Sequence, residues 1–126
     1  MALLEIRDAN DVVVVSFTQS TLVDDQMIQQ VGRQFDKLTL EAAADRKLLL
    51  DFQKVDFMAS AMLGQIIRLN KQCRKDKTQL KLCNISPNIM EVFKITNLTK
   101  ILEIHKDESE ALEAFGPARR SWFRRQ

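Results

Sequence analysis

Hydrophobic and polar positions along the chain change their spacing several times, which predicts alternating strands and helices. Weak alternation over residues 3–7 and a β-branched run over residues 12–15 predict a hairpin, because turn-forming residues separate the two segments. Two acidic residues, Asp24 and Asp25, then open a helix that we expect to reach about residue 40. Its apolar side chains recur at helical spacing and comprise Met27, Ile28, Val31, Phe35 and Leu38.

The middle of the chain predicts a strand, a long helix and another strand. Residues 48–52 are apolar on both faces, as expected for a central strand that helices cover on one side. A helix opens at Ser60 and is broken near residue 77, after which residues 80–82 alternate into a strand. One stripe at helical spacing, mostly apolar, comprises Leu63, Ile66, Ile67, Asn70 and Cys73.

The last third of the chain predicts two further helices with a strand between them. Ser86 and Pro87 start one helix, with serine at the cap and proline in the first turn. Residues 101–104 predict a last strand, and residues 107–115 predict a last helix. The resulting order, β-β-α-β-α-β-α-β-α, indicates an α/β fold with a single mixed β-sheet of about four or five strands and about four helices packed mainly on one face.

Gly116 and Pro117 end the predicted domain, which covers residues 1–116. Residues 117–126 form a basic tail with two aromatic residues, which we expect to be flexible. A solvated terminus explains this composition, and so does binding to acidic surfaces, RNA or anionic lipid.

The composition is that of one globular domain, with 126 residues, 45% of them hydrophobic and 29% charged. A formal net charge of +2 does not by itself imply nucleic acid or an acidic substrate. No apolar run approaches the roughly 20 residues of a membrane span, and the first residues lack the apolar core of a signal peptide. We therefore expect a cytoplasmic protein in which Cys73 and Cys83 are reduced thiols.

Few residues suggest catalysis or metal binding. Cys73 and Cys83 do not form a CxxC site, and His105 has no partner at a spacing typical of metal ligands. The chain has three glycines, all far apart, so it contains no glycine-rich phosphate loop. The sequence therefore predicts no enzyme activity, no cofactor and no metal, and a structural role for His105.

Ser60 lies where the apolar strand and its polar connection meet the new helix, within the run from Lys47 to Gly64. A serine there sits among the first free backbone N–H groups of the helix. A phosphate attached to it would meet aligned donors and the positive end of the helix dipole. Serine is also a common N-cap that satisfies one backbone N–H. Both interpretations, a phosphorylation site and a structural cap, fit the position.

This stretch resembles the STAS domain of bacterial anti-sigma factor antagonists. The family pattern is an apolar strand, Asp, an apolar residue, then Phe/Tyr-Ile/Met-Asp-Ser-Ser/Thr-Gly-Leu-Gly. The matching residues are Asp51, Phe57, Met58, Ser60, Leu63 and Gly64. The chain departs from the pattern where the family has an aspartate, a second hydroxyl residue and a glycine, at Ala59, Ala61 and Met62 respectively.

A second stretch is similar to the family's strand, xxSPxxxxxF, xxxxL, xKI segment. It runs from Leu82 through Ser86-Pro87 and Phe93 to Lys100-Ile101. The resemblance covers about residues 4–115 and implies the STAS fold. It further implies that an unphosphorylated antagonist binds an anti-sigma factor, which is also a GHKL-type serine kinase, and so releases a sigma factor. Phosphorylation of Ser60 would abolish binding, and a PP2C-type phosphatase would restore it.

The resemblance implies a docking surface at the start of the Ser60 helix and the loop beside it. The expected partner-binding residues are Asp24, Phe57, Met58, Ala59, Ser60, Ala61 and Met62. Asp24 is also explained as a helix-starting acid, and Met62 as a core or rim filler.

Two other functions remain open. The apolar residues around Ser60 also suit a STAS scaffold that is not phosphorylated and has a fixed protein interface. A STAS module that binds a nucleotide or another small ligand beside Ser60 is the second alternative. The expected partners include no direct nucleic acid and no membrane, and a homodimer is compatible with the sequence.

Overall fold

We describe the protein from a computed structural model, which defines residues 2–9, 11–41 and 47–116. The basic tail predicted for residues 117–126 lies outside these described residues. Within them, no helix is both long enough and apolar enough to cross a membrane.

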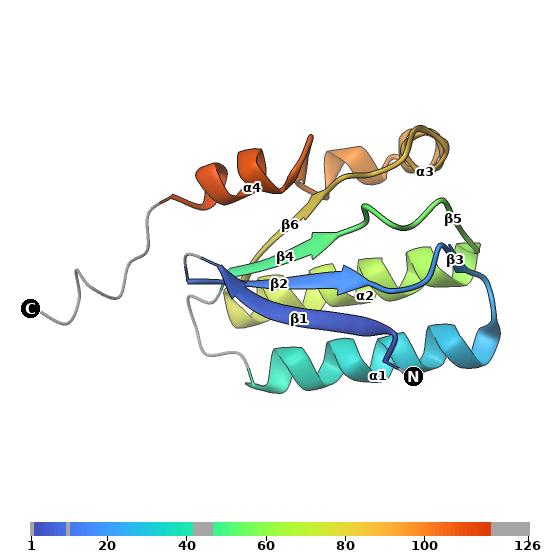
Figure 1. Ribbon diagram of the computed structural model, residues 1–126, viewed down its shortest axis with the longest axis horizontal. Helices are drawn as coiled ribbons and strands as arrows, with labels where there is room; N and C mark the ends of the chain where they lie inside the picture. Colours follow the sequence, from blue (N-terminus) through green and yellow to red (C-terminus); the bar gives the residue numbers. More distant parts are fainter. Residues whose placement is uncertain (1, 10, 42–46, 117–126) are drawn as a thin grey trace, which may run out of the picture.

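A five-stranded mixed sheet forms the centre of the molecule (Figure 1). Its strands, in spatial order, are β1 (Leu4–Ala9), β2 (Val12–Phe17), β4 (Lys47–Asp51), β6 (Gln79–Cys83) and β7 (Ile104–His105). β1 pairs antiparallel with β2, and the remaining pairs are parallel. Because the parallel strands share one direction, their carboxyl ends meet at the same edge of the sheet, where binding sites of α/β proteins commonly lie.

In the described part of the chain, four helices surround this sheet: α1 (Asp25–Glu41), α2 (Ser60–Asp76), α3 (Pro87–Ile95) and α4 (Glu108–Phe115). α1 and α2 pack side by side across one face, whereas α4 lies on the opposite face against β4, β6 and β7 (Figure 1). α3 lies near the carboxyl end of β6 and contacts β5 (Phe57–Met58).

Two hydrophobic clusters match this arrangement. The larger one fills the space between the sheet and α1, α2 and α3, and includes Phe17, Phe35, Phe52 and Phe93. The Phe17 and Phe52 rings lie with centroids 4.8 Å apart. The smaller cluster joins the other face of the sheet to α4 and comprises Val12, Val14, Leu49, Cys83, Ala111 and Phe115. Most apolar area is therefore buried on one side of the sheet, which is the side that α1 and α2 cover.

The predicted α/β class, with one main mixed sheet and four helices in the described part of the chain, is confirmed. The strand predicted over residues 101–104 is wrong in its position. Residues 101–103 instead form a turn after the 3₁₀ helix η1 (Leu98–Lys100), and β7 begins only at Ile104. Leu102 is buried although it lies in neither element, and its N–H donates to the Leu98 carbonyl. A short apolar run fits a buried loop as well as a strand, so its spacing alone does not decide.

A second, two-stranded sheet was not predicted. β3 (Thr21–Leu22) pairs parallel with β5, with Thr21 opposite Phe57 and Leu22 opposite Met58. Two-residue strands have no detectable period, so the sequence carries no signal for them.

Candidate functional site

Two connections at the carboxyl edge of the main sheet, one between β2 and α1 and the other between β4 and α2, are joined by backbone hydrogen bonds. These bonds fix the position at which α2 starts. The Ala59 N–H donates to the Leu22 carbonyl at 2.9 Å, and the Asp56 N–H donates to the Ser20 carbonyl at 2.8 Å. The connection before α1 therefore runs directly beside the connection before α2. We call the resulting surface the α2 entrance and define it by the exposed or half-buried residues Val23, Asp24, Phe57, Ala59, Ser60 and Ala61.

The backbone at the start of α2 lacks a capping side chain. Ala59 is the N-cap residue, with φ −76° and ψ 161°, and makes no side-chain cap hydrogen bond. Ser60 is the first helical residue, so its interpretation as the structural N-cap is wrong. The side chain of Ser60 is exposed and makes no hydrogen bond to another described residue. The first turn also contains no acidic residue, so nothing there offsets the positive end of the helix dipole.

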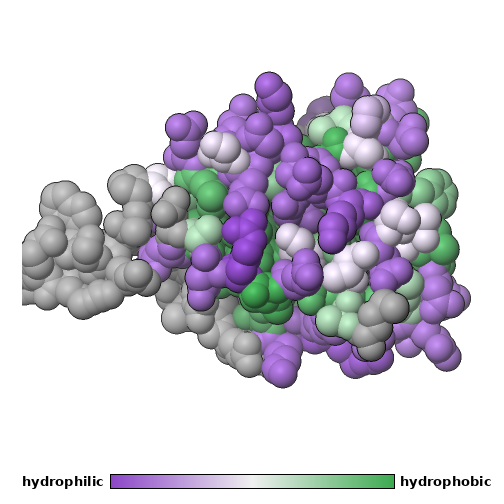
Figure 2. Space-filling model, viewed as in Figure 1, coloured by the Kyte–Doolittle hydropathy of each residue, from purple (hydrophilic) through white to green (hydrophobic). Residues whose placement is uncertain are grey.

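Large apolar side chains are exposed next to Ser60. Phe57 is 56% exposed and Val23 is 46% exposed, and they belong to the two connections that form the α2 entrance. α3, which contacts β5, also exposes Val92 and Ile95. Figure 2 shows hydrophobic surface at the end of the molecule where Figure 1 places β3, β5 and α3. Clustered apolar groups of this size on a surface are typical of protein contact sites.

Met58 and Met62 support the α2 entrance from below. Met62 is fully buried and Met58 is 9% exposed, and both belong to the larger core cluster. The interpretation of Met62 as a core filler agrees with this burial. Their side chains anchor β5 and the first turn of α2, while Phe57 and Ala61 remain exposed beside them.

Gly64 lies one turn further along α2 and is exposed. A methyl group at this position would meet no other part of the described chain within 4 Å. Its backbone has no positive φ that would require glycine. Glycine inside a helix costs about 0.5–1 kcal/mol relative to alanine. Neither packing nor backbone conformation therefore explains this glycine, and it leaves a flat spot on the exposed face of α2.

Asp24 caps α1. Its carboxylate Oδ2 accepts a hydrogen bond from the Met27 N–H at 3.0 Å, and its carbonyl accepts one from the Ile28 N–H at 2.9 Å. The helix-starting interpretation of Asp24 is therefore confirmed. Asp24 lies two residues after Leu22, whose carbonyl accepts a hydrogen bond from the Ala59 N–H. The Asp24 carboxylate therefore places a negative charge at the α2 entrance.

A buried carboxylate fixes the strand end from which the connection to Ser60 departs. Asp51 is 6% exposed, and its Oδ1 accepts hydrogen bonds from Asn84 Nδ2 at 2.9 Å and from the Gln53 N–H at 3.0 Å. Asn84 has φ +58°, a conformation that asparagine adopts more readily than most residues. No pattern in the sequence indicates this role for Asn84. Asp51 thereby ties the ends of β4 and β6 together behind the α2 entrance.

The remaining reactive side chains lie away from this surface. Burial and the nearby Asp76 raise the pKa of Cys73 to about 11, and burial with surrounding carboxylates raises the pKa of Cys83 to about 12. The half-buried His105 lies between Glu103 and Glu110, with ring nitrogens 2.9 Å and 3.4 Å from their carboxylates. Among the residues that the structure defines, no group of histidines, cysteines and carboxylates could hold a metal ion.

Comparisons with known proteins identify the family. The family model of the STAS domain matches residues 4–111. BtrV of Bordetella bronchiseptica, described as a candidate anti-sigma factor antagonist, is 29% identical over 94 residues, which is 75% of this chain and 76% of BtrV.

Solved structures share the fold. An anti-sigma factor antagonist (STAS) domain protein from Planctomyces limnophilus superposes with a TM-score of 0.81 at 25% identity, over 89% of this chain and 97% of that one. The anti-sigma factor antagonist SpoIIAA in its unphosphorylated form gives a TM-score of 0.72 at 19% identity, over 88% of this chain and 94% of SpoIIAA. The chain belongs to the STAS domain family.

Proposed function

We propose that this protein is an anti-sigma factor antagonist that acts by binding, and that its docking surface is the α2 entrance. The observation that carries the proposal is the position of Ser60. It is an exposed first helical residue without a hydrogen-bonding partner among the described residues, and exposed apolar side chains flank it. The relationship to BtrV supports the same function.

Phosphorylation of Ser60 is the proposed control. A phosphoserine carries about −1.5 to −2 charges at neutral pH. The uncapped N–H groups and the helix dipole of α2 would accommodate that charge within the isolated domain. A partner that covers Phe57 and Ala61 would have to bury the same charge in an apolar contact, at a cost of several kcal/mol. The modification would therefore block docking while the fold stays intact.

The circuit proposed around this site has three further proteins: an anti-sigma factor, a phosphatase and a sigma factor. The anti-sigma factor is a GHKL-type serine kinase that phosphorylates Ser60 and supplies its own ATP, so the STAS chain needs no cofactor. A PP2C-type phosphatase removes the phosphate and restores binding. The unphosphorylated chain occupies the anti-sigma factor and so frees the sigma factor.

Ala59 and Ala61 favour a second candidate, a scaffold that is not phosphorylated. Both residues make the helix start less polar than the family pattern, and Ala61 is exposed. A permanent apolar interface would use the same surface, but it would not be switched by charge.

Two measurements separate these candidates. The first is intact-mass spectrometry with phosphosite mapping of the protein purified from its native cells, with Ser60→Ala as the control. We expect one phosphate on Ser60, and its absence under every growth condition would contradict the switch.

The second measurement is calorimetric titration of the anti-sigma factor encoded in the same genome with wild type, Ser60→Ala and Ser60→Asp. We expect Ser60→Ala to bind like wild type and Ser60→Asp to bind at least about 100-fold more weakly, because a buried unpaired charge costs about 3–5 kcal/mol. Equal binding of all three would favour the scaffold. No binding by wild type would contradict the antagonist function itself.

A further inference from the structure

The exposed face of α2 continues beyond the α2 entrance as a single row of side chains. Exposed positions follow one another at spacings of three and four residues, which places them in line along a helix. This row, which we call the α2 stripe, comprises Ala61, Gly64, Arg68, Lys71 and Lys75. At about 1.5 Å of rise per residue it is roughly 21 Å long, enough for an extended protein contact.

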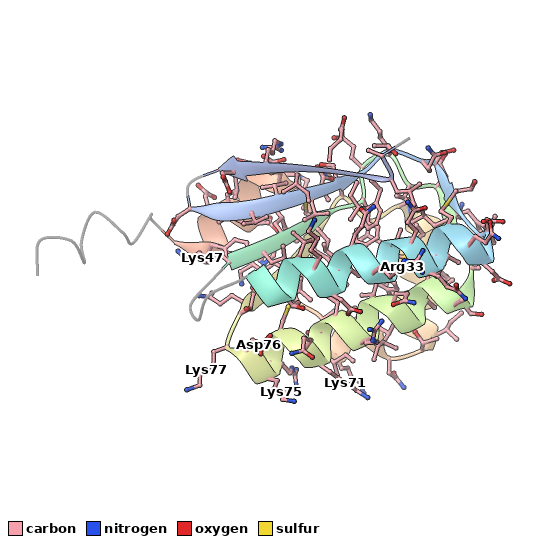
Figure 3. All side chains as sticks on the ribbon, turned by 90° about the horizontal axis from the view of Figure 1, so that it is seen from below. Arg33, Lys47, Lys71, Lys75, Asp76 and Lys77 are labelled. Carbon is pink, nitrogen blue, oxygen red and sulfur yellow. The ribbon has the colours of Figure 1, made fainter. Side chains whose placement is uncertain are left out.

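The two halves of the α2 stripe differ in chemistry. The half next to the α2 entrance is small and flat at Ala61 and Gly64, and the other half is basic. Figure 3 shows Lys71 and Lys75 pointing outward, away from the body of the molecule. Arg68 pairs with Asp36 at 2.5 Å, whereas Lys71 and Lys75 form no ion pair with any other residue that the structure defines. These two ammonium groups are therefore available to an external acid.

The segment that contains α2 is strongly basic. Residues 60–77 carry five basic side chains against one acid, namely Arg68, Lys71, Arg74, Lys75 and Lys77 against Asp76. The acids of the α4 region lie on the opposite face of the sheet and are largely engaged internally. Glu108 pairs with Arg7, and Glu110 contacts His105. Other exposed acids, such as Glu5, Asp8 and Glu113, form no ion pair with another described residue, so pairing between two copies of this chain is one of the outcomes that the experiment below tests.

We propose that the docking contact extends along the whole α2 stripe, with an acidic segment of the anti-sigma factor lying against Lys71 and Lys75. This inference rests on the proposed function and adds the chemistry of the partner's surface. The basic half is continuous with the apolar α2 entrance, so one protein surface can cover both. A nucleic acid or lipid surface could also use the exposed Phe57, but it would find only Lys71 and Lys75 as unpaired cations of the α2 stripe, because Arg68 is paired with Asp36.

The test is the association rate with the recombinant anti-sigma factor of the same genome, measured at low and high salt. Lys71→Glu is compared with Lys106→Glu, because both reverse one exposed lysine and change the net charge equally. Lys106 precedes α4 on the other face, so its variant controls for overall charge. Lys71→Glu places an acid four residues before Lys75, a favourable helix pair, so α2 should stay folded. Circular dichroism checks this.

We expect Lys71→Glu to slow association about tenfold at low salt and much less at high salt, because screening removes the long-range attraction. Lys106→Glu should associate like wild type. Equal rates for the two variants, with wild type binding normally, would overturn this inference and leave the proposed function standing. Failure of wild type to bind would overturn both.

Three further measurements test the other possible occupants. They are binding to phosphatidylglycerol vesicles, binding to a single-stranded oligonucleotide, and self-association of the chain alone by light scattering. If Lys71→Glu abolished vesicle binding, oligonucleotide binding or self-association while leaving the anti-sigma factor contact unchanged, the basic half would serve that other occupant and the inference would be wrong.

Discussion

At the scale of single residues, some of the side chains next to Ser60 are buried in the core and others are exposed to a partner. Phe57 is exposed while Met58 is buried, and Ala61 is exposed while Met62 is buried. The sequence could identify this apolar group but not its division, because a two-residue strand and a helix start do not reveal which way each side chain points. The exposed part of this residue set is therefore smaller than the set expected from sequence.

Asp51 offers a test of how the site is supported. Asp51→Ala removes the acceptor for Asn84 Nδ2 and the Gln53 N–H in a buried position. We expect a loss of about 1–3 kcal/mol in the free energy of unfolding, because the donors lose their partner. Urea denaturation measures this, and Asp8→Ala at an exposed position is the control. Equal midpoints for the two variants would show that Asp51 does not anchor the strand ends.

The two cysteines give a second test at this scale. Burial raises the pKa of Cys73 to about 11 and that of Cys83 to about 12, so both remain protonated near neutral pH. The thiolate is the reactive form, and both side chains are also shielded from reagent. We expect no fast reaction with a thiol reagent at pH 8 in the folded protein and reaction of both thiols in urea. Rapid labelling of the native protein would contradict the burial of these residues.

At the scale of elements, α2 carries both the proposed modification and the proposed contact. Its start is held by the β3–β5 pair, and its C-terminal cap is Lys77 with φ +62°. The helix, and the side of it that faces the core, were predictable because its mostly apolar stripe is long and regular. The parallel pairing of β3 with β5 was not predictable from the hydrophobic pattern, since two-residue strands and hydrogen bonds between distant connections leave no local pattern.

A substitution at Gly64 tests the stability of α2 and the binding of a partner separately. Gly64→Ala should raise the free energy of unfolding by about 0.5–1 kcal/mol, because alanine favours the helix and its methyl group meets nothing inside the domain. The same methyl group should weaken binding of the anti-sigma factor if the partner lies close to α2. Thermal denaturation and calorimetric titration of one variant measure both effects. A more stable variant with unchanged affinity would place the partner away from Gly64.

At the scale of the whole molecule, the two faces of the sheet are packed and stabilised differently. One face buries the larger core beneath α1 and α2, and the other carries α4 through a smaller cluster and several ion pairs. Lys81 is central to the second face, because it pairs with Glu103 and lies 5.0 Å from the centre of the Phe115 ring. The element order predicted the layers, but these charged contacts join residues far apart in sequence and could not be predicted.

The Glu103 contacts predict a pH dependence of stability. Partial burial acts to raise the pKa of Glu103, but hydrogen bonds and charges from Lys81 and His105 outweigh it and lower that pKa below 4.5. A lowered pKa in the folded state stabilises the protein above about pH 4.5, and this contribution is lost as the pH falls through the folded-state pKa.

We therefore expect Glu103→Gln to be less stable than wild type at pH 7 by about 1 kcal/mol or less, since 52% of the Glu103 side chain is exposed. The difference should shrink at pH 3. Urea denaturation at both pH values measures it, with the exposed Glu113→Gln as control. A difference that grows on acidification would contradict the sign of the pKa change.

We propose that the unphosphorylated α2 entrance displaces a sigma factor and that phosphate on Ser60 prevents this. The most direct measurement is the release of sigma factor from its complex with the anti-sigma factor of the same genome, on addition of the unmodified chain or of the chain phosphorylated on Ser60. We predict release by the unmodified chain and none by the phosphorylated chain at the same concentration. Equal release by both forms, or release by neither, would contradict the account.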